Sequence, residues 1–219
     1  MLRVGLTGGL GSGKSTAARM FAAHGAVVLS SDEMGRELMQ QGQAVYAQIV
    51  ARFGPGVVEA GGELDRAALA RMAFGDGRVE ELNAIVHPAV IARQAGMVKE
   101  IVRRDADAVV MVESALVFET KYGDGGGWRR FDKIVLVRAK DEVKVARFMA
   151  RASQGKTLSP AERQGLEAEA RRRMAQQMND DAKAAQSDYV LTNDGTVEEL
   201  RAQVAALWPA LSAAGKRRV

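Results

Sequence analysis

The sequence predicts an α/β protein, a three-layer sandwich in which a five-stranded parallel sheet lies between helices. Three observations support this prediction. Short apolar runs rich in β-branched residues alternate with longer segments of helical periodicity, as strands joined by helical crossovers do. Of the 219 residues, 47% are hydrophobic, which is enough to fill one such core. Glycine-rich breaks at 54–56, 61–62 and 75–77 divide the helical segments.

Two connections between the predicted strands are much longer than a simple crossover, which needs roughly a dozen residues. The first follows the second strand and has helical periodicity over Asp65–Phe74, Val79–Val86 and Pro88–Arg104. The second, Asp141–Gln186, is helical in pattern and rich in Arg and Gln. The strands themselves are expected at Arg3–Thr7, Ala26–Ser30, Ala108–Glu113, Lys133–Val137 and Asp188–Thr192.

These lengths predict one domain, 1–219, built from a core and two insertions. The core is expected to comprise residues 1–32, 105–140 and 187–219. A helical substrate subdomain is expected at about 33–104 and a helical lid at about 141–186. Gly155, Ser159 and Pro160 predict a turn inside the lid.

The first strand runs directly into a loop that matches the nucleotide-phosphate motif G-x-x-x-x-G-K-[ST]. Its glycines permit positive φ angles, so that backbone N–H groups can point at phosphate oxygens. The helix that follows offers unpaired amides and a positive dipole end. The Lys14 ammonium can reach the β- and γ-phosphates, and the Ser15 hydroxyl can ligate Mg²⁺. The expected nucleotide-binding residues are Gly9, Leu10, Gly11, Ser12, Gly13, Lys14, Ser15 and Thr16.

Composition excludes several classes of protein. The chain has no cysteine, so disulfides and thiolate metal sites are excluded. The first strand begins almost at the N-terminus and no apolar run reaches the roughly 18 to 20 residues of a membrane span, so a cytoplasmic protein is expected. The net charge is +4, but aromatic residues do not alternate with the basic ones, which makes nucleic acid the weaker interpretation. The tail Lys216–Arg218 is expected to be a solvated terminus.

Two acidic residues end predicted strands, where ligands of open parallel sheets bind. Asp32 follows the second strand and is expected beside the phosphate loop as a base or as a group that orients an acceptor hydroxyl. Asp is also a favoured helix N-cap, so capping of a helix at 33–39 is an equal alternative. Glu113 ends the third strand in the Walker-B arrangement, which helps to hold Mg²⁺ or its waters.

The arginines of the lid segment are candidates for neutralising the transferred phosphoryl group. Arg147 and Arg151 are four residues apart and share a helix face, and Arg171–Arg173 follow. We expect these guanidinium groups to have few anchors in the core. The alternative for any single arginine is a solvated helix face.

Four segments accompany the phosphate loop: Ser31-Asp32, Leu82–Pro88 (L-N-x-x-x-H-P), Glu113–Glu119 ending in L-x-F-E, and Asp188–Gly195 (D-Y-V-x-x-N-x-G). With them the chain resembles the dephospho-coenzyme A kinase family over nearly its full length. The resemblance implies a P-loop nucleotide-kinase-like fold and ATP-dependent, Mg²⁺-assisted phosphorylation of the ribose 3′-hydroxyl of dephospho-coenzyme A, the last step of coenzyme A synthesis.

The same resemblance assigns roles to individual residues. Asp32 matches the acid that activates or orients the acceptor hydroxyl, and Arg147 matches the lid arginine near the ATP phosphates. Asp32, Lys14 and Arg147 are therefore the expected catalytic residues. Substrate contacts are expected at Asp32, His87 and Glu113, although a structural histidine packed beside Pro88 is an equal alternative for His87. Another small-molecule P-loop kinase, for a nucleoside monophosphate or a sugar acid, is the competing function, and a monomer or weak homo-oligomer is expected.

Overall fold

The computed structural model describes residues 1–122 and 127–216. The chain divides into two compact units, of which the first combines Met1–Leu29 with Ile101–Val219 and the second is Ser30–Glu100. Of the basic tail, Arg217 and Arg218 lie outside the described residues. Among the described residues, none of the helices combines the length and the apolar character that crossing a membrane requires.

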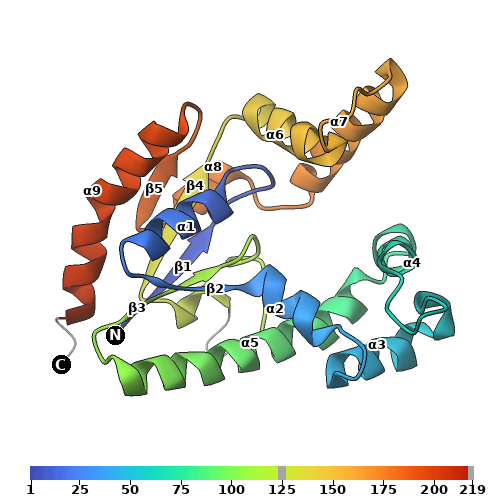
Figure 1. Cartoon of the computed structure of the whole chain (residues 1–219), viewed down its shortest axis with the longest axis horizontal. Helices are drawn as coiled ribbons and strands as arrows, with labels where there is room; N and C mark the ends of the chain where they lie inside the picture. The colour runs from blue at the N-terminus through green and yellow to red at the C-terminus, as the bar shows by residue number, and fades with distance from the viewer. Residues whose placement is uncertain (123–126, 217–219) are drawn as a thin grey trace. The chain divides into compact units, whose positions relative to one another are not determined.

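A five-stranded parallel sheet forms the centre of the first unit, in the order β2-β3-β1-β4-β5 (Figure 1). Strand β1 pairs with both β3 and β4, and β5 pairs with β4 at one edge. All five predicted strands are confirmed, each to within one residue at either end. They are β1 Leu2–Thr7, β2 Val27–Ser30, β3 Val109–Glu113, β4 Lys133–Arg138 and β5 Tyr189–Thr192.

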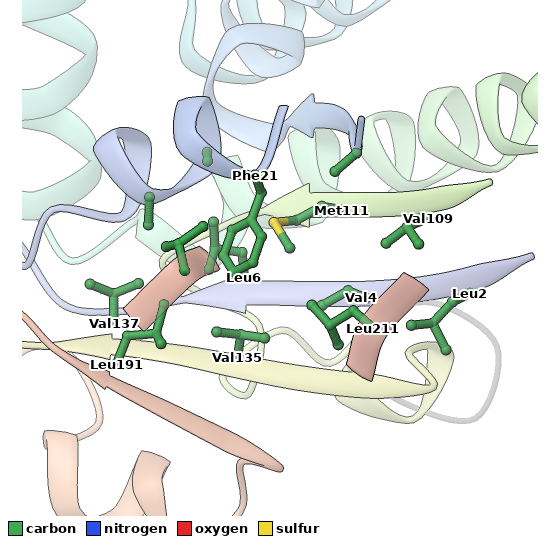
Figure 2. Packing of buried hydrophobic residues seen from close by; sticks show 14 of the residues in the cluster. Leu2, Val4, Leu6, Phe21, Val109, Met111, Val135, Val137, Leu191 and Leu211 are labelled. Carbon is green, nitrogen blue, oxygen red and sulfur yellow. The ribbon is translucent and has the colours of Figure 1, made fainter. Parts of the chain in front are cut away.

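The main hydrophobic core lies between this sheet and two helices, α1 (Lys14–Ala23) and α9 (Val197–Lys216). Alternate residues of β1 point to this face, so that Leu2, Val4 and Leu6 are buried together, as the period of two in a strand requires. Figure 2 shows the Phe21 ring of α1 directed toward Leu6 and Met111. Burial of a phenylalanine ring contributes about 1.5–3 kcal/mol, so the packing of Phe21 stabilises the position of α1 against the sheet.

The segment predicted as a lid forms three helices, α6 (Asp141–Ser153), α7 (Pro160–Ala175) and α8 (Asp180–Ala184). Val145 and Phe148 of α6 pack against Ala170 of α7. The predicted turn is present, because α7 begins after Ser159. The Ser159 hydroxyl accepts from the Glu162 amide while the Glu162 carboxylate accepts from the Ser159 amide, which is a capping box.

The second unit is helical and contains α2 (Ser31–Leu38), α3 (Ala44–Phe53), a 3₁₀ turn Pro55–Val57, α4 (Arg66–Ala70), a π turn Arg71–Gly75 and most of α5 (Val79–Arg104). The two segments predicted to be helical, Val79–Val86 and Pro88–Arg104, form one continuous helix with Pro88 inside it. Proline removes one backbone donor and disfavours a helix interior. Leu82, Ile85 and Ala89 pack on the same core that contains Ile49, and this packing holds the helix across the proline.

Candidate active site

The glycine-rich loop at residues 8–13 connects β1 to α1 and takes the conformation that its composition predicts. Gly11 and Gly13 have φ angles of 72° and 97°, which are readily adopted only by glycine. A Cβ atom on Gly11 would lie 2.4 Å from the Lys144 carbonyl oxygen, and one on Gly13 would lie 2.2 Å from Asn193 Nδ2. Both glycines are therefore required by close approach as well as by conformation. Lys14, Ser15 and Thr16 form the first turn of α1.

Ser15 and Glu113 are brought together at the end of this loop. Ser15 Oγ donates a hydrogen bond to Glu113 Oε1 at 2.7 Å. The register of β1 with β3 pairs Leu6 with Glu113, which carries the buried carboxylate to the carboxyl edge of the sheet. Hydroxyl and carboxylate oxygens suit Mg²⁺, which usually takes only one or two protein ligands and completes its shell with phosphates and water. Within the described part of the chain no group of three or more His, Asp or Glu side chains forms a self-sufficient metal site.

Asn193, which follows β5, joins the phosphate loop to α6. Its side chain is buried and donates from Nδ2 to the Ser12 carbonyl at 2.8 Å. Arg147 of α6 donates from one guanidinium nitrogen to the Asn193 carbonyl at 2.9 Å and from the other to Asn193 Oδ1 at 3.4 Å. The sequence did not single out Asn193 as a site residue. Its position directly after a sheet strand, where ligands gather, was the available signal.

The lid arginines were expected to have few anchors in the core; Arg147 has one, whereas those at the end of α7 pair within their own helix. Arg147 bonds Asn193, and the arginines at the end of α7 bond acids one turn earlier on the same helix. Arg171 pairs with Glu167, and Arg172 and Arg173 pair with Glu169. Acid and base at i,i+3 or i,i+4 lie on one helix face, so this pairing follows from the spacing. Arg151 and Arg163 are exposed.

Three further side chains cover the outer side of the loop at Gly9. Lys144 of α6 is buried, with Nζ 2.8 Å from Asp180 and 2.9 Å from Asp141. Burial lowers the pKa of Lys144, but the hydrogen bonds to these two carboxylates outweigh that effect and the pKa lies above its ordinary value. Gln177 accepts from the Leu10 amide at 3.0 Å. The sequence does not predict Lys144, Gln177 or Asp180 as site residues, since nothing local marks them.

A pocket of about 780 Å³ opens beside this cluster. Gly9, Lys144, Arg171 and Gln177 are among its lining residues, together with the ends of β4 and β5. Its volume falls in the range of sites for small molecules and cofactors. The pocket lies at the carboxyl edge of the sheet, where a nucleotide is expected in open parallel folds.

The remaining predicted residues, Asp32 and His87, belong to the helical unit. Helix α2 begins at Ser31, and its N-cap is Ser30, whose hydroxyl accepts from the Glu33 amide at 3.4 Å. The alternative of Asp32 as the cap is therefore wrong, because the helix starts two residues earlier than predicted. Asp32 is an exposed residue of the first turn. His87 is half-buried on α5, directly before Pro88.

Comparisons with known proteins agree on one family. The family model for dephospho-CoA kinase matches residues 2–199. The dephospho-CoA kinase of Symbiobacterium thermophilum is 40% identical over 94% of this chain and 80% of its own, and that of Geobacillus kaustophilus is 37% identical over 96% and 98%. Among solved structures, TT1252 from Thermus thermophilus has a TM-score of 0.71 at 33% identity, covering 94% of this chain and 96% of its own. A shikimate kinase from Bacteroides thetaiotaomicron shares the fold, with a TM-score of 0.52 at 15% identity over 96% and 98%.

Proposed function

The chain belongs to the dephospho-coenzyme A kinase family, which phosphorylates the ribose 3′-hydroxyl of dephospho-coenzyme A with ATP in the last step of coenzyme A synthesis, and on that premise we propose roles for its residues. The phosphate loop, residues 9–16, binds the ATP phosphates. Lys14 neutralises charge on the β- and γ-phosphates as it develops. The observation that carries the proposal is the contact of Ser15 with Glu113 at the end of a loop whose glycines take positive φ angles.

Ser15 and Glu113 are the residues that would hold Mg²⁺. Glu113 accepts a hydrogen bond from the Ser15 hydroxyl, so a carboxylate and a hydroxyl oxygen lie side by side. The ion supplies Lewis-acid stabilisation of the phosphate oxygens when it is bound. Glu113 Oε1 also orients Ser15 Oγ, because a serine hydroxyl rotates to suit its acceptor.

The acceptor side rests on Asp32, His87 and Arg147. Asp32 accepts the proton of the 3′-hydroxyl as its oxygen attacks the γ-phosphorus, and ADP leaves on the opposite side. Arg147 stabilises the charge that spreads over the transferred group, and His87 contacts the acceptor. This assignment follows the residues that match the family's segments.

We further propose a cytoplasmic enzyme, monomeric or weakly homo-oligomeric, that acts without a nucleic-acid or membrane partner. The lack of cysteine fits a reducing compartment. Sedimentation at several protein concentrations tests the oligomeric state. A dimer that does not dissociate on dilution would contradict the proposed monomer or weak homo-oligomer.

A coupled assay of ADP release tests the function directly. Dephospho-coenzyme A, a nucleoside monophosphate and shikimate are offered in turn, with Lys14→Ala as the inactive control. Of the three acceptors, we expect only dephospho-coenzyme A to support the release of ADP. Lys14→Ala should lower kcat by roughly 10²–10³-fold or more. Comparable turnover of another acceptor would contradict the assignment.

A further inference from the structure

Gln177 stands out among the residues around the phosphate loop that the proposed roles do not use. It lies in the short connection between α7 and α8. Its Oε1 atom accepts a hydrogen bond from the Leu10 amide at 3.0 Å and would lie 3.4 Å from a Cβ atom on Gly9. The side chain therefore touches the loop at the two residues that precede its tight turn.

The connection that carries Gln177 is fixed by other contacts. Its own backbone amide donates to the Met174 carbonyl at 3.0 Å, and the next amide, of Met178, donates to Glu119 Oε1 at 3.1 Å. That carboxylate is 2.9 Å from the Nζ atom of Lys183, whose side chain is fully buried. An ion pair in such surroundings breaks only at considerable cost. Gln177 thus reaches the loop from a firmly held position.

The hydrogen bond to Leu10 determines how the Gln177 amide is oriented. A primary amide group is planar, and its oxygen and its NH₂ group are separate substituents of one carbon that point in different directions. Because Oε1 faces the loop, the NH₂ group is directed away from Leu10, and Gln177 lines the 780 Å³ pocket. In residues 1–122 and 127–216, no protein oxygen accepts a hydrogen bond from this NH₂ group.

The charges nearby leave a role for a neutral donor at this point. Lys144 is the cation closest to Gly9, at 3.8 Å from the Cβ position, but Asp141 and Asp180 both bond its ammonium. Its positive charge is offset by two carboxylates, which weakens its attraction for phosphate. An amide NH₂ donates to a phosphate oxygen without needing a counter-ion.

We propose that Gln177 is a nucleotide-contacting residue, which holds the Leu10 amide through Oε1 and donates from Nε2 to a phosphate oxygen of ATP. The inference rests on the proposed binding of ATP phosphates by the loop. It requires glutamine specifically, because both functions come from one rigid group. Glutamate retains the acceptor but replaces the donor with a negative oxygen, and methionine retains neither.

Calorimetric binding of a non-hydrolysable ATP analogue tests the proposal with three variants. Gln177→Glu should weaken binding by roughly tenfold or more, since a charged hydrogen bond is lost and a repulsion is added. Gln177→Met should weaken binding no more than Gln177→Glu does. Gln176→Glu is the matched control, because Gln176 is the exposed neighbour and takes the same charge. It should stay within roughly twofold of the parent chain.

The ranking of the variants by affinity for the analogue shows whether the amide donates to the phosphate or only supports the loop. If Gln177→Glu bound the analogue like Gln176→Glu while Gln177→Met lost affinity, the amide would only support the loop and the proposal would be overturned. A parent chain that bound no ATP would overturn the loop assignment as well. An independent measurement on the parent chain follows the side-chain NH₂ resonances of Gln177, which should shift on addition of the analogue while those of Gln176 remain in place.

Discussion

The hydroxyl of Ser15 and the carboxylate of Glu113 are joined by a 2.7 Å hydrogen bond although 98 positions separate them in the chain. The contact exists because β1 and β3 are parallel neighbours that end at the same edge of the sheet. It brings the two residues that the sequence assigns to Mg²⁺ into direct contact. The metal-binding prediction therefore concerns a single site rather than two separate residues.

Glu113→Gln is expected to raise the Mg²⁺ concentration needed for half-maximal activity by roughly 10- to 100-fold. The amide keeps an oxygen for the Ser15 hydroxyl but removes the negative charge that attracts the cation. Mg²⁺ titration of the initial rate measures the effect. Glu142→Gln, at an exposed acid of α6, should leave the titration unchanged, and an equal shift in both variants would contradict the assignment.

Asp32→Asn should reduce kcat by roughly 10²-fold or more while leaving the melting temperature nearly unchanged. The structure sharpens this prediction, because the N-cap of α2 is Ser30 and Asp32 is an exposed first-turn residue. Glu33→Gln is the matched control, since it removes the same charge from the same turn. If both variants lost the same activity, the effect would come from the helix terminus and not from proton transfer.

Ser30→Ala completes this comparison. It removes the cap of α2 and should lower the free energy of unfolding by roughly 1 kcal/mol. Chemical unfolding gives the loss, and turnover at saturating substrate should change much less than in Asp32→Asn.

Arg147→Ala should lower kcat much more than it raises the KM for dephospho-coenzyme A, because the guanidinium is expected to act on the transferred group and not on the acceptor. Steady-state kinetics with both substrates varied gives the two constants. Arg163→Ala, at an exposed position of α7, should affect neither. A more damaging Arg163→Ala would move the catalytic role to a different part of this segment.

The contribution of Glu81 to stability should disappear in acid. Hydrogen bonds from Arg78 and Arg52 lower the pKa of Glu81 from 4.5 to about 2. A carboxyl whose pKa is lower in the folded chain stabilises the fold above its unfolded value. The difference in melting temperature between the parent chain and Glu81→Gln should therefore be largest above pH 4.5 and should decrease as the pH falls toward 2. Glu63→Gln, at an exposed acid of the same unit, should show no such trend.

Local patterns in the sequence were sufficient for the strands and for the phosphate loop. The strand runs are apolar and β-branched, so burial and backbone preference agree over each of them. In the loop, Gly11 and Gly13 supply the positive φ angles of the turn, and this requirement is set by the neighbouring residues of the loop. The continuity of α5 through Pro88 has a tertiary cause instead. Packing of α5 on both sides of the proline outweighed a local preference.

Tertiary structure alone determined which side chains surround the loop. Asn193 reaches Ser12 across 181 positions of sequence and Gln177 reaches Leu10 across 167. These contacts depend on the strand order, on the path of α6 to α8 and on the ion pair of the buried Lys183 with Glu119. Residue type and spacing determine where a backbone turns and what chemistry it carries. Which donor meets which acceptor is decided when distant elements pack, because a hydrogen bond requires atoms within about 3 Å of each other.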